Sequence, residues 1–216
     1  MTLKTLITGY PRGATQWAYE TLKSAGCRAG LNSVFCDQSN NQITYSRVKN
    51  CAHEFEVSCF SAPFLSHPSL SGVNIIQLHR HPAAIASSLY WLGIFQPSHN
   101  GYAAQLAAFI DRHCPNSKIK YKGTPLQRTL STVVEWHDRY LLPSQDAHKS
   151  VRAEDGVTSF LAACGVSSAG VLMPPQNVSG CRHYSPAEFG RFPAGKDVLD
   201  LTENLGYVQE WFLPYE

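Results

Sequence analysis

Short apolar segments alternate with longer amphipathic segments along most of the chain. The strand-like segments are residues 4–8, 55–59, 73–78 and 150–152. The helix-like segments are residues 14–25, 83–92, 102–113, 126–142 and 157–164. Short, nearly continuous apolar strands that alternate with helices are typical of a parallel sheet covered on both faces. The pattern therefore predicts an α/β fold in which helices flank a central parallel sheet.

The length of the chain predicts one domain. At 216 residues it can build one well-formed core, and no run of Pro, Gly or Ser is long enough for a linker. We therefore expect a single domain over residues 1–216. Residues 28–50 are polar, and their pattern places no element there. This segment is either an ordinary surface loop or an acceptor-binding surface over the sheet edge. Residues 198–212 predict a final helix with a break near Gly206.

Composition narrows the class of protein. Hydrophobic residues make up 44% of the chain and charged residues 16%, which favours a compact fold over disorder. The formal net charge of +2 does not predict nucleic-acid binding. We find neither a signal-peptide pattern nor a run near the ~20 apolar residues of a membrane span, so we expect a soluble, cytoplasmic protein. The seven cysteines include no CxxC, which indicates free thiols and no zinc site or disulfide framework.

The first candidate for chemistry is the turn from Gly9 to Thr15, between the first predicted strand and helix. Such a turn directs backbone N–H groups and the positive end of the helix dipole at an anion. Gly9 and Gly13 permit tight turns, Arg12 adds a positive charge and Thr15 offers a hydroxyl. The GxxxxGK[ST] signature of nucleotide-binding loops is missing. A glycine-rich turn of this kind serves either phosphate binding or plain packing.

The second candidate is the segment "VNIIQLHRHPAAIASSLYWL", residues 73–92. A predicted buried strand leads into Arg80, and Pro82 occupies a position favoured at the start of a helix. Ser87 and Ser88 follow about two turns later. Arg80 and a serine could hold one anion together. The alternative is that Arg80 pairs with a carboxylate while the serines pack in a small-residue helix face.

Taken together, the two segments resemble the sulfotransferase superfamily. "TGYPRGATQW" is similar to the family's 5′-phosphosulfate loop, TYPKSGTTW, and "RHPAAIASS" is similar to its 3′-phosphate motif, RxPxxxxxS. "VRAEDGVTSFLAACGV" is similar to a later strand-and-helix segment that begins VRYEDL. The resemblance implies a fold related to P-loop nucleotide kinases. It also implies 3′-phosphoadenosine 5′-phosphosulfate as the donor, adenosine 3′,5′-bisphosphate as the product, and no metal.

The resemblance assigns residues to the donor. The 5′-phosphosulfate loop would comprise Pro11, Arg12, Gly13, Ala14, Thr15 and Gln16. Arg12 falls on the family's lysine, which contacts the transferring sulfonate, and Trp17 falls on the aromatic residue near adenine. Arg80 and Ser88 fall on the pair that holds the 3′-phosphate, with Ser87 as a neighbour. "GRFPAG" is the nearest match to the family's late RKG loop, which assigns Arg191 and Gly195. Ala14 replaces the family's glycine, and Gln16 replaces a threonine.

The acceptor needs a base, which the family takes from the part of the chain before the 3′-phosphate strand. Here that part contains His53 and Glu56. A histidine has its pKa near working pH, whereas a glutamate needs burial to raise its pKa. We therefore expect His53 or Glu56 to be the base, with Glu56 slightly less favoured. The alternative is a surface histidine beside a partly buried acid.

These observations predict an enzyme that moves a sulfonate group to a hydroxyl or amine of a small-molecule, sugar or lipid acceptor. Arginine is a poor proton donor at neutral pH, so Arg12 would act by its charge. Two alternatives stay open. One is a P-loop kinase or nucleoside triphosphatase, and the other is a non-catalytic nucleotide-binding module that kept the fold.

Overall fold

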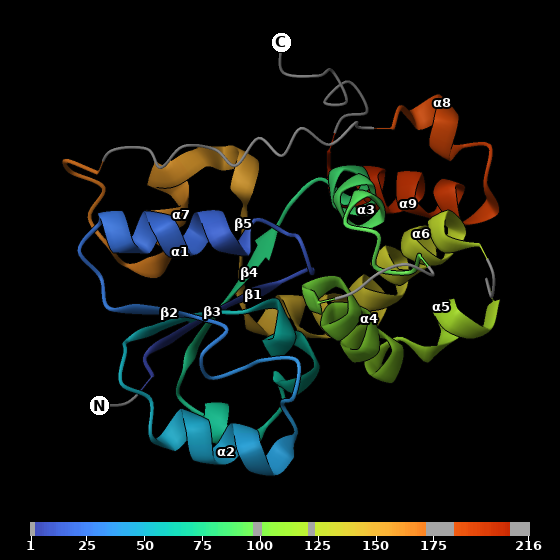
Figure 1. Ribbon diagram of the computed structural model, residues 1–216. Helices are drawn as coiled ribbons and strands as arrows, with labels where there is room; N and C mark the ends of the chain where they lie inside the picture. Colours follow the sequence, from blue (N-terminus) through green and yellow to red (C-terminus); the bar gives the residue numbers. More distant parts are fainter. Residues whose placement is uncertain (1–2, 97–100, 121–123, 172–183, 208–216) are drawn as a thin grey trace. The chain divides into compact units, whose positions relative to one another are not determined.

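The chain divides into two compact units. The structure is a computed structural model (Figure 1) that describes residues 3–96, 101–120, 124–171 and 184–207. The first unit consists of residues 1–80 and 139–177, and the second of residues 81–138 and 178–216. The expectation of a single domain over residues 1–216 stays a prediction.

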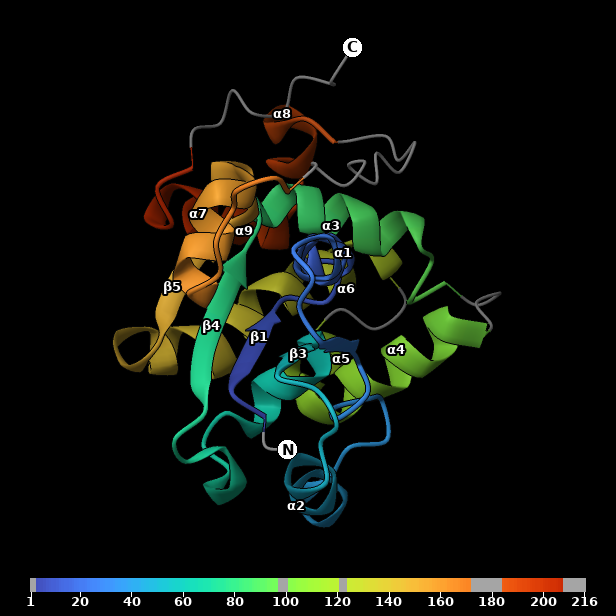
Figure 2. The same cartoon turned by 90° about the vertical axis from the view of Figure 1, so that its left-hand side faces the viewer.

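The first unit contains a five-stranded parallel sheet. Its strands are β1 (Thr5–Gly9), β2 (Ala29–Leu31), β3 (Phe55–Val57), β4 (Asn74–His79) and β5 (Lys149–Arg152). Their order is β2-β3-β1-β4-β5, and every pairing is parallel (Figure 2). The predicted α/β fold with a central parallel sheet is therefore confirmed, and the four expected strands lie within a few residues of their predicted positions.

One face of the sheet carries the main core of the first unit. Ile7 lies in register with Val57 on β3 and with Ile76 on β4, so these side chains share a face. Helices α1 (Thr15–Ser24) and α7 (Gly156–Cys164) cover this face and lie side by side (Figure 1). Burial of their apolar residues against the strands is the main force that holds this layer together. The buried core residues on the two helices are Ala18, Leu22, Val157, Phe160, Leu161 and Cys164.

The opposite face of the sheet carries buried polar side chains. Gln77 on β4 is fully buried, and its Nε2 donates to the carbonyl oxygen of Leu141 at 3.1 Å and to Ser144 Oγ at 2.7 Å. Ser144 Oγ in turn donates to the carbonyl oxygen of Tyr140 at 2.9 Å. These bonds tie the segment after residue 138 to the sheet.

The predicted helix over residues 126–142 is too long. Helix α6 is Pro125–Trp136, and the chain continues as a π-helical turn, His137–Leu141, and a 3₁₀ segment, Leu142–Ala147. The carbonyl oxygens of Tyr140 and Leu141 accept side-chain hydrogen bonds from Ser144 and Gln77. These side-chain bonds replace the regular helical hydrogen bonds, and apolar periodicity carries no trace of them.

Residues 28–50, which sequence reasoning left without elements, contain strand β2 and helix α2 (Asn41–Lys49). Asn40 caps α2, because its Oδ1 accepts hydrogen bonds from the N–H groups of Gln42 and Ile43, each at 3.1 Å. Short 3₁₀ segments complete the described part of this unit. They are η1 (Cys59–Phe64), η2 (Pro68–Leu70) and η5 (Ala153–Asp155).

The described residues of the second unit are helical. The helices besides α6 are α3 (Pro82–Trp91), α4 (Gly101–His113), α5 (Pro115–Lys120), α8 (Pro186–Phe189) and α9 (Pro193–Asn204). Helices α3, α6 and α9 pack against one another. Glu135 on α6 accepts hydrogen bonds from the N–H groups of Asn116 at 3.2 Å and Ser117 at 2.8 Å, which fixes the start of α5. The expected final helix corresponds to α9, and residues 208–216 lie outside the described part.

The helices and the cysteines bear on two further predictions. No helix in the described part of the chain has both the length and the apolar character needed to cross a bilayer. Six cysteines are free thiols, and four of these are buried, whereas Cys181 lies outside the described residues.

Acid should destabilise the second unit through His113 on α4. Burial lowers the pKa of His113 to about 4 from 6.5, and the positive charge of Arg112 acts in the same direction. The pKa of His113 is lower in the folded than in the unfolded protein. The contribution of the neutral, buried His113 to the free energy of unfolding is therefore fully present above pH 6.5 and is lost as the pH falls toward 4. Replacing His113 by Gln should remove about 1–2 kcal/mol of that loss, after allowance for solvent screening. Urea unfolding at several pH values measures the free energy of unfolding of both proteins. If that free energy falls equally with pH in the two proteins, the prediction is wrong.

Candidate functional site

The candidate site lies where the strand order changes direction. Adjacent strands β1 and β4 lead to opposite sides of the sheet, since β1 is followed by β2 and β4 is followed by β5. In open parallel sheets, ligands bind outside the carboxyl ends of the strands at such a point. The loop Gly9–Thr15 leaves the carboxyl end of β1, and Arg80 leaves that of β4. The topology therefore brings together the two segments that sequence analysis selected separately.

The loop after β1 has an unusual backbone. Arg12 has φ 65° and Ala14 has φ 68°, so two residues with side chains adopt the left-handed region. Each such residue costs about 1–2 kcal/mol relative to a right-handed conformation. Conformations of this kind cluster at functional sites, where the surrounding structure enforces them.

Two glycines allow the loop to pack closely. A Cβ atom at Gly9 would collide with the carbonyl oxygen of Leu78, and one at Gly13 would lie 2.8 Å from the carbonyl oxygen of Tyr10. The N–H of Gly13 donates to that same oxygen at 2.9 Å, which closes the turn. Gly9 therefore permits close approach of β1 and β4 at their carboxyl ends.

The start of helix α1 offers backbone donors. Ala14 is the N-cap and supplies no capping side chain, and the first backbone bond of the helix runs from Ala18 N–H to the Ala14 carbonyl oxygen at 3.0 Å. Among the described residues, we find no acceptor for the N–H groups of Thr15, Gln16 and Trp17. Unpaired N–H groups and the helix dipole together favour an anion here.

Arg12 and Arg80 both lie at the carboxyl ends of the strands. Arg80 Nη1 donates to the carbonyl oxygen of Arg12 at 3.2 Å, which couples the β4 end to the loop. Burial raises the pKa of the Cys59 thiol to about 12, and the positive charge of Arg12 acts in the opposite direction. Arg12 therefore lies near the carboxyl end of β3 as well. Sequence reasoning missed Cys59, because only the parallel pairing of β1 with β3 brings it to this edge.

The remaining side chains in and after the loop differ in their exposure. Pro11 is buried, whereas Arg12 is only partly buried. Gln16 is exposed, and its Nε2 donates to Glu20 Oε1 at 2.7 Å. Trp17 is partly buried, and its ring packs on that of Phe160 with 5.2 Å between centroids. This contact fixes the aromatic ring at the end of the loop.

Three of the predicted donor-binding residues belong to the second unit. Ser88 is buried on α3, and the neighbouring Ser87 Oγ accepts a hydrogen bond from the N–H of Tyr184 at 3.3 Å. Arg191 is exposed. Gly195 is buried in the first turn of α9, where a Cβ atom would collide with the backbone of Phe189. Gly195 thus has a packing role, and its assignment to a donor-binding loop stays a prediction.

The two candidate bases form one cluster in the first unit. His53 Nε2 lies 2.8 Å from Glu56 Oε2, and Ser33 Oγ contacts both residues. Glu56 has no exposed surface. Sequence reasoning missed Ser33, although a glutamate inside the apolar strand β3 was a signal, because a buried carboxylate requires partners.

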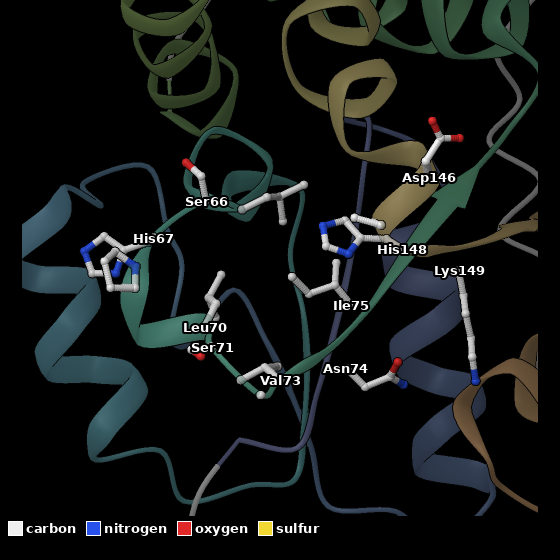
Figure 3. A pocket seen from close by; sticks show the side chains of 14 residues that line it. Ser66, His67, Leu70, Ser71, Val73, Asn74, Ile75, Asp146, His148 and Lys149 are labelled. Carbon is white, nitrogen blue, oxygen red and sulfur yellow. The ribbon is translucent and has the colours of Figure 1, made fainter.

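One cavity lies at the amino ends of the strands. It has a volume of about 710 Å³ and is lined from the amino ends of β4 and β5, near Asn74 and Lys149. Figure 3 shows His148 directed into it, with Ile75 and Val73 below. Because the strands are parallel, this cavity and the loop after β1 lie at opposite edges. Its lining includes Asp146, His148 and Lys149, but none of the residues that the sequence selected for anion binding.

A scan of the chain against models of known protein families and a search of curated proteins both find no match. The described residues include no group of three or more His, Cys, Asp or Glu side chains arranged to hold a metal ion.

The strain at Ala14 can be measured. Replacing Ala14 by Gly should raise the free energy of unfolding by about 0.5–1 kcal/mol, because glycine adopts φ 68° without a Cβ penalty. Ala162→Gly is the matched control, since Ala162 is exposed within helix α7. That change should lower the free energy of unfolding by about 1 kcal/mol. Chemical denaturation tests both variants, and a loss of stability in Ala14→Gly would show that residue 14 is not left-handed.

Proposed function

We propose that this protein is a sulfotransferase that moves the sulfonate group of 3′-phosphoadenosine 5′-phosphosulfate to a hydroxyl or amine of an acceptor. The observation that carries the proposal is the joined pair of Arg12 and Arg80 at the change of direction in the sheet. Arg12 lies in a strained loop before helix N–H groups for which the described residues offer no acceptor, and Arg80 bonds to the backbone of that loop. The motif resemblance supplies the identity of the donor.

Sulfonyl transfer places defined demands on the site. The acceptor must approach in line with the breaking S–O bond, and negative charge that grows on the leaving phosphate oxygen must be stabilised. The N–H groups of Thr15, Gln16 and Trp17 are suited to hold the 5′-phosphate. Arg12 supplies positive charge beside the bridging oxygen, which is a purely electrostatic role.

The remaining contacts in the proposal come from the resemblance. Arg80 and Ser88 hold the 3′-phosphate, Trp17 lies near adenine, and Arg191 with Gly195 closes the donor site. The bond from Arg80 Nη1 to the carbonyl oxygen of Arg12 leaves the positive charge of the guanidinium in place. A single arginine can therefore brace the loop and still contribute charge to an anion. Acceptors of the proposed class are small molecules, sugars or lipid headgroups.

Ligand binding should separate this proposal from its alternatives. Adenosine 3′,5′-bisphosphate at about 100 times its dissociation constant should stabilise the protein by about 2.7 kcal/mol. ATP at the same concentration should give a much smaller shift. Thermal unfolding with each nucleotide measures the difference. A preference for ATP would support the kinase reading, and binding of the bisphosphate without turnover of the donor would support a non-catalytic module.

Arg80 should account for recognition of the 3′-phosphate. Arg80→Ala should reduce the stabilisation by the bisphosphate to the level given by AMP, which lacks the 3′-phosphate, because a charge-assisted contact is lost. Arg28→Ala is the matched control, since Arg28 is exposed at the amino end of β2. That variant should keep the preference of the unaltered protein. Equal loss in both variants would contradict the assigned role of Arg80.

A further inference from the structure

Glu56 occupies a position that is unusual for a charged residue. It is the central residue of β3, pairs in register with Leu6 on β1 and Gly30 on β2, and has no exposed surface. Val57, the next residue, faces α1 and α7, so the Glu56 side chain lies on the other face of the sheet. A carboxylate at such a depth is stable only with a full set of partners.

The partners of Glu56 come mainly from the loop after β2. Oε1 accepts hydrogen bonds from three consecutive N–H groups, those of Ser33 and Val34 at 2.8 Å and that of Phe35 at 3.3 Å. Oε2 accepts a hydrogen bond from Ser33 Oγ at 2.7 Å and lies 2.8 Å from His53 Nε2. One buried side chain thus sets the conformation of the loop.

These contacts use the accepting capacity of the carboxylate. Two carboxylate oxygens offer about four lone-pair directions, and Glu56 already has five neighbouring donors. An acceptor hydroxyl would have to displace a loop N–H or His53 in order to give a proton to Glu56. The geometry therefore favours a structural role for this carboxylate over a role as the base.

His53 is committed to the same cluster through one nitrogen. Nε2 faces Glu56 Oε2 at 2.8 Å and Ser33 Oγ at 3.1 Å, and the Ser33 hydroxyl donates to Glu56. In the tautomer that carries its proton on Nε2, the ring donates a hydrogen bond to the carboxylate. Gly30 makes room for the ring, because a Cβ atom there would collide with both His53 and Ser33.

The loop that Glu56 holds borders the candidate site. Ser58, which follows β3, donates from Oγ to Asn32 Oδ1 at 2.7 Å and to the Phe35 carbonyl oxygen at 3.0 Å. Its N–H donates to the carbonyl oxygen of Ile7 on β1 at 2.9 Å. The next residue, Cys59, is close enough to Arg12 to feel its charge. A continuous path of contacts thus runs from Glu56 through the loop to the neighbourhood of Arg12.

We infer that Glu56, with His53 and Ser33, is a positioning cluster that fixes residues 32–35 as the acceptor-side wall of the proposed sulfotransferase site. This inference rests on the proposed function, and it assigns neither Glu56 nor His53 as the base. Asn32 has φ 52°, so the wall begins with a left-handed residue; its side chain accepts a hydrogen bond from Ser58, and the N–H of the next residue, Ser33, donates to Glu56.

A pair of His53 variants tests the inference. A Gln side chain can donate one N–H to Glu56 Oε2, as His53 Nε2 does, but it cannot act as a base. His53→Ala should lower the hydrogen-exchange protection of the amides of residues 33–35 by about 10-fold, and His53→Gln should restore it to within about 3-fold of the unaltered protein. The rate of donor hydrolysis, with water as the acceptor, should follow the same order.

Several outcomes would overturn the inference. If His53→Gln hydrolyses the donor as slowly as His53→Ala while its loop stays protected, loop positioning does not account for the role of His53, His53 is a base, and the inference is wrong. Unchanged protection in both variants would show that the cluster does not hold the loop. Glu54→Gln is the matched control, because Glu54 pairs outward with Lys4 at 2.6 Å, and it should leave residues 33–35 protected.

Binding of adenosine 3′,5′-bisphosphate separates this inference from the proposed function. The His53 variants should bind it within about 2-fold of the unaltered protein, because the hydrogen bonds of the cluster go to residues 33–35 and not to the loop after β1. If the unaltered protein fails to bind the bisphosphate, the proposed function fails, while the exchange data still decide whether the cluster holds the loop.

Discussion

The hydrogen bond from the Arg80 guanidinium to the carbonyl oxygen of Arg12 joins the two loops on which the candidate site depends. It requires β1 and β4 to be neighbours and their carboxyl ends to approach closely. Gly9 permits this approach, since any side chain there would meet the backbone of Leu78. The turn that follows places Arg12 and Ala14 in the left-handed region. The packing of β1 against β4 therefore also determines where Arg12 and Arg80 lie.

The periodicity of the sequence was sufficient to predict the parallel α/β fold. Apolar runs revealed β1 and β4, which are buried along nearly their whole length, whereas β3 and β5 are shorter and β5 has two exposed residues. Strand β2 has three residues, and helix α2 begins at an Asn cap in a polar segment, so neither gave a hydrophobic signal. The end of α6 was misjudged because the hydrogen bond from Gln77 to the carbonyl oxygen of Leu141 is a tertiary contact that periodicity cannot reveal.

The candidate site was predicted in part. The residues at the ends of β1 and β4 were selected from local pattern and motif resemblance, and the strand order brings Arg12 and Arg80 together. The partners of Glu56 were not predicted, because Ser33 is 23 positions away in sequence. A glutamate at the centre of a three-residue strand nevertheless indicated that the carboxylate needs hydrogen-bond donors nearby. The donors around Glu56 give this catalytic candidate a second, structural role, because they tie residues 33–35 to β3.

The most direct test of the central claim is a titration of isotope-labelled protein with adenosine 3′,5′-bisphosphate, followed by amide chemical shifts. The account predicts that the largest shifts fall on Gly13, Ala14, Thr15, Gln16 and Trp17, with a second group next to Arg80. Shifts concentrated at the amino edge of the sheet, around Asn74 and His148, would contradict it. An absence of shifts at saturating nucleotide would contradict it equally.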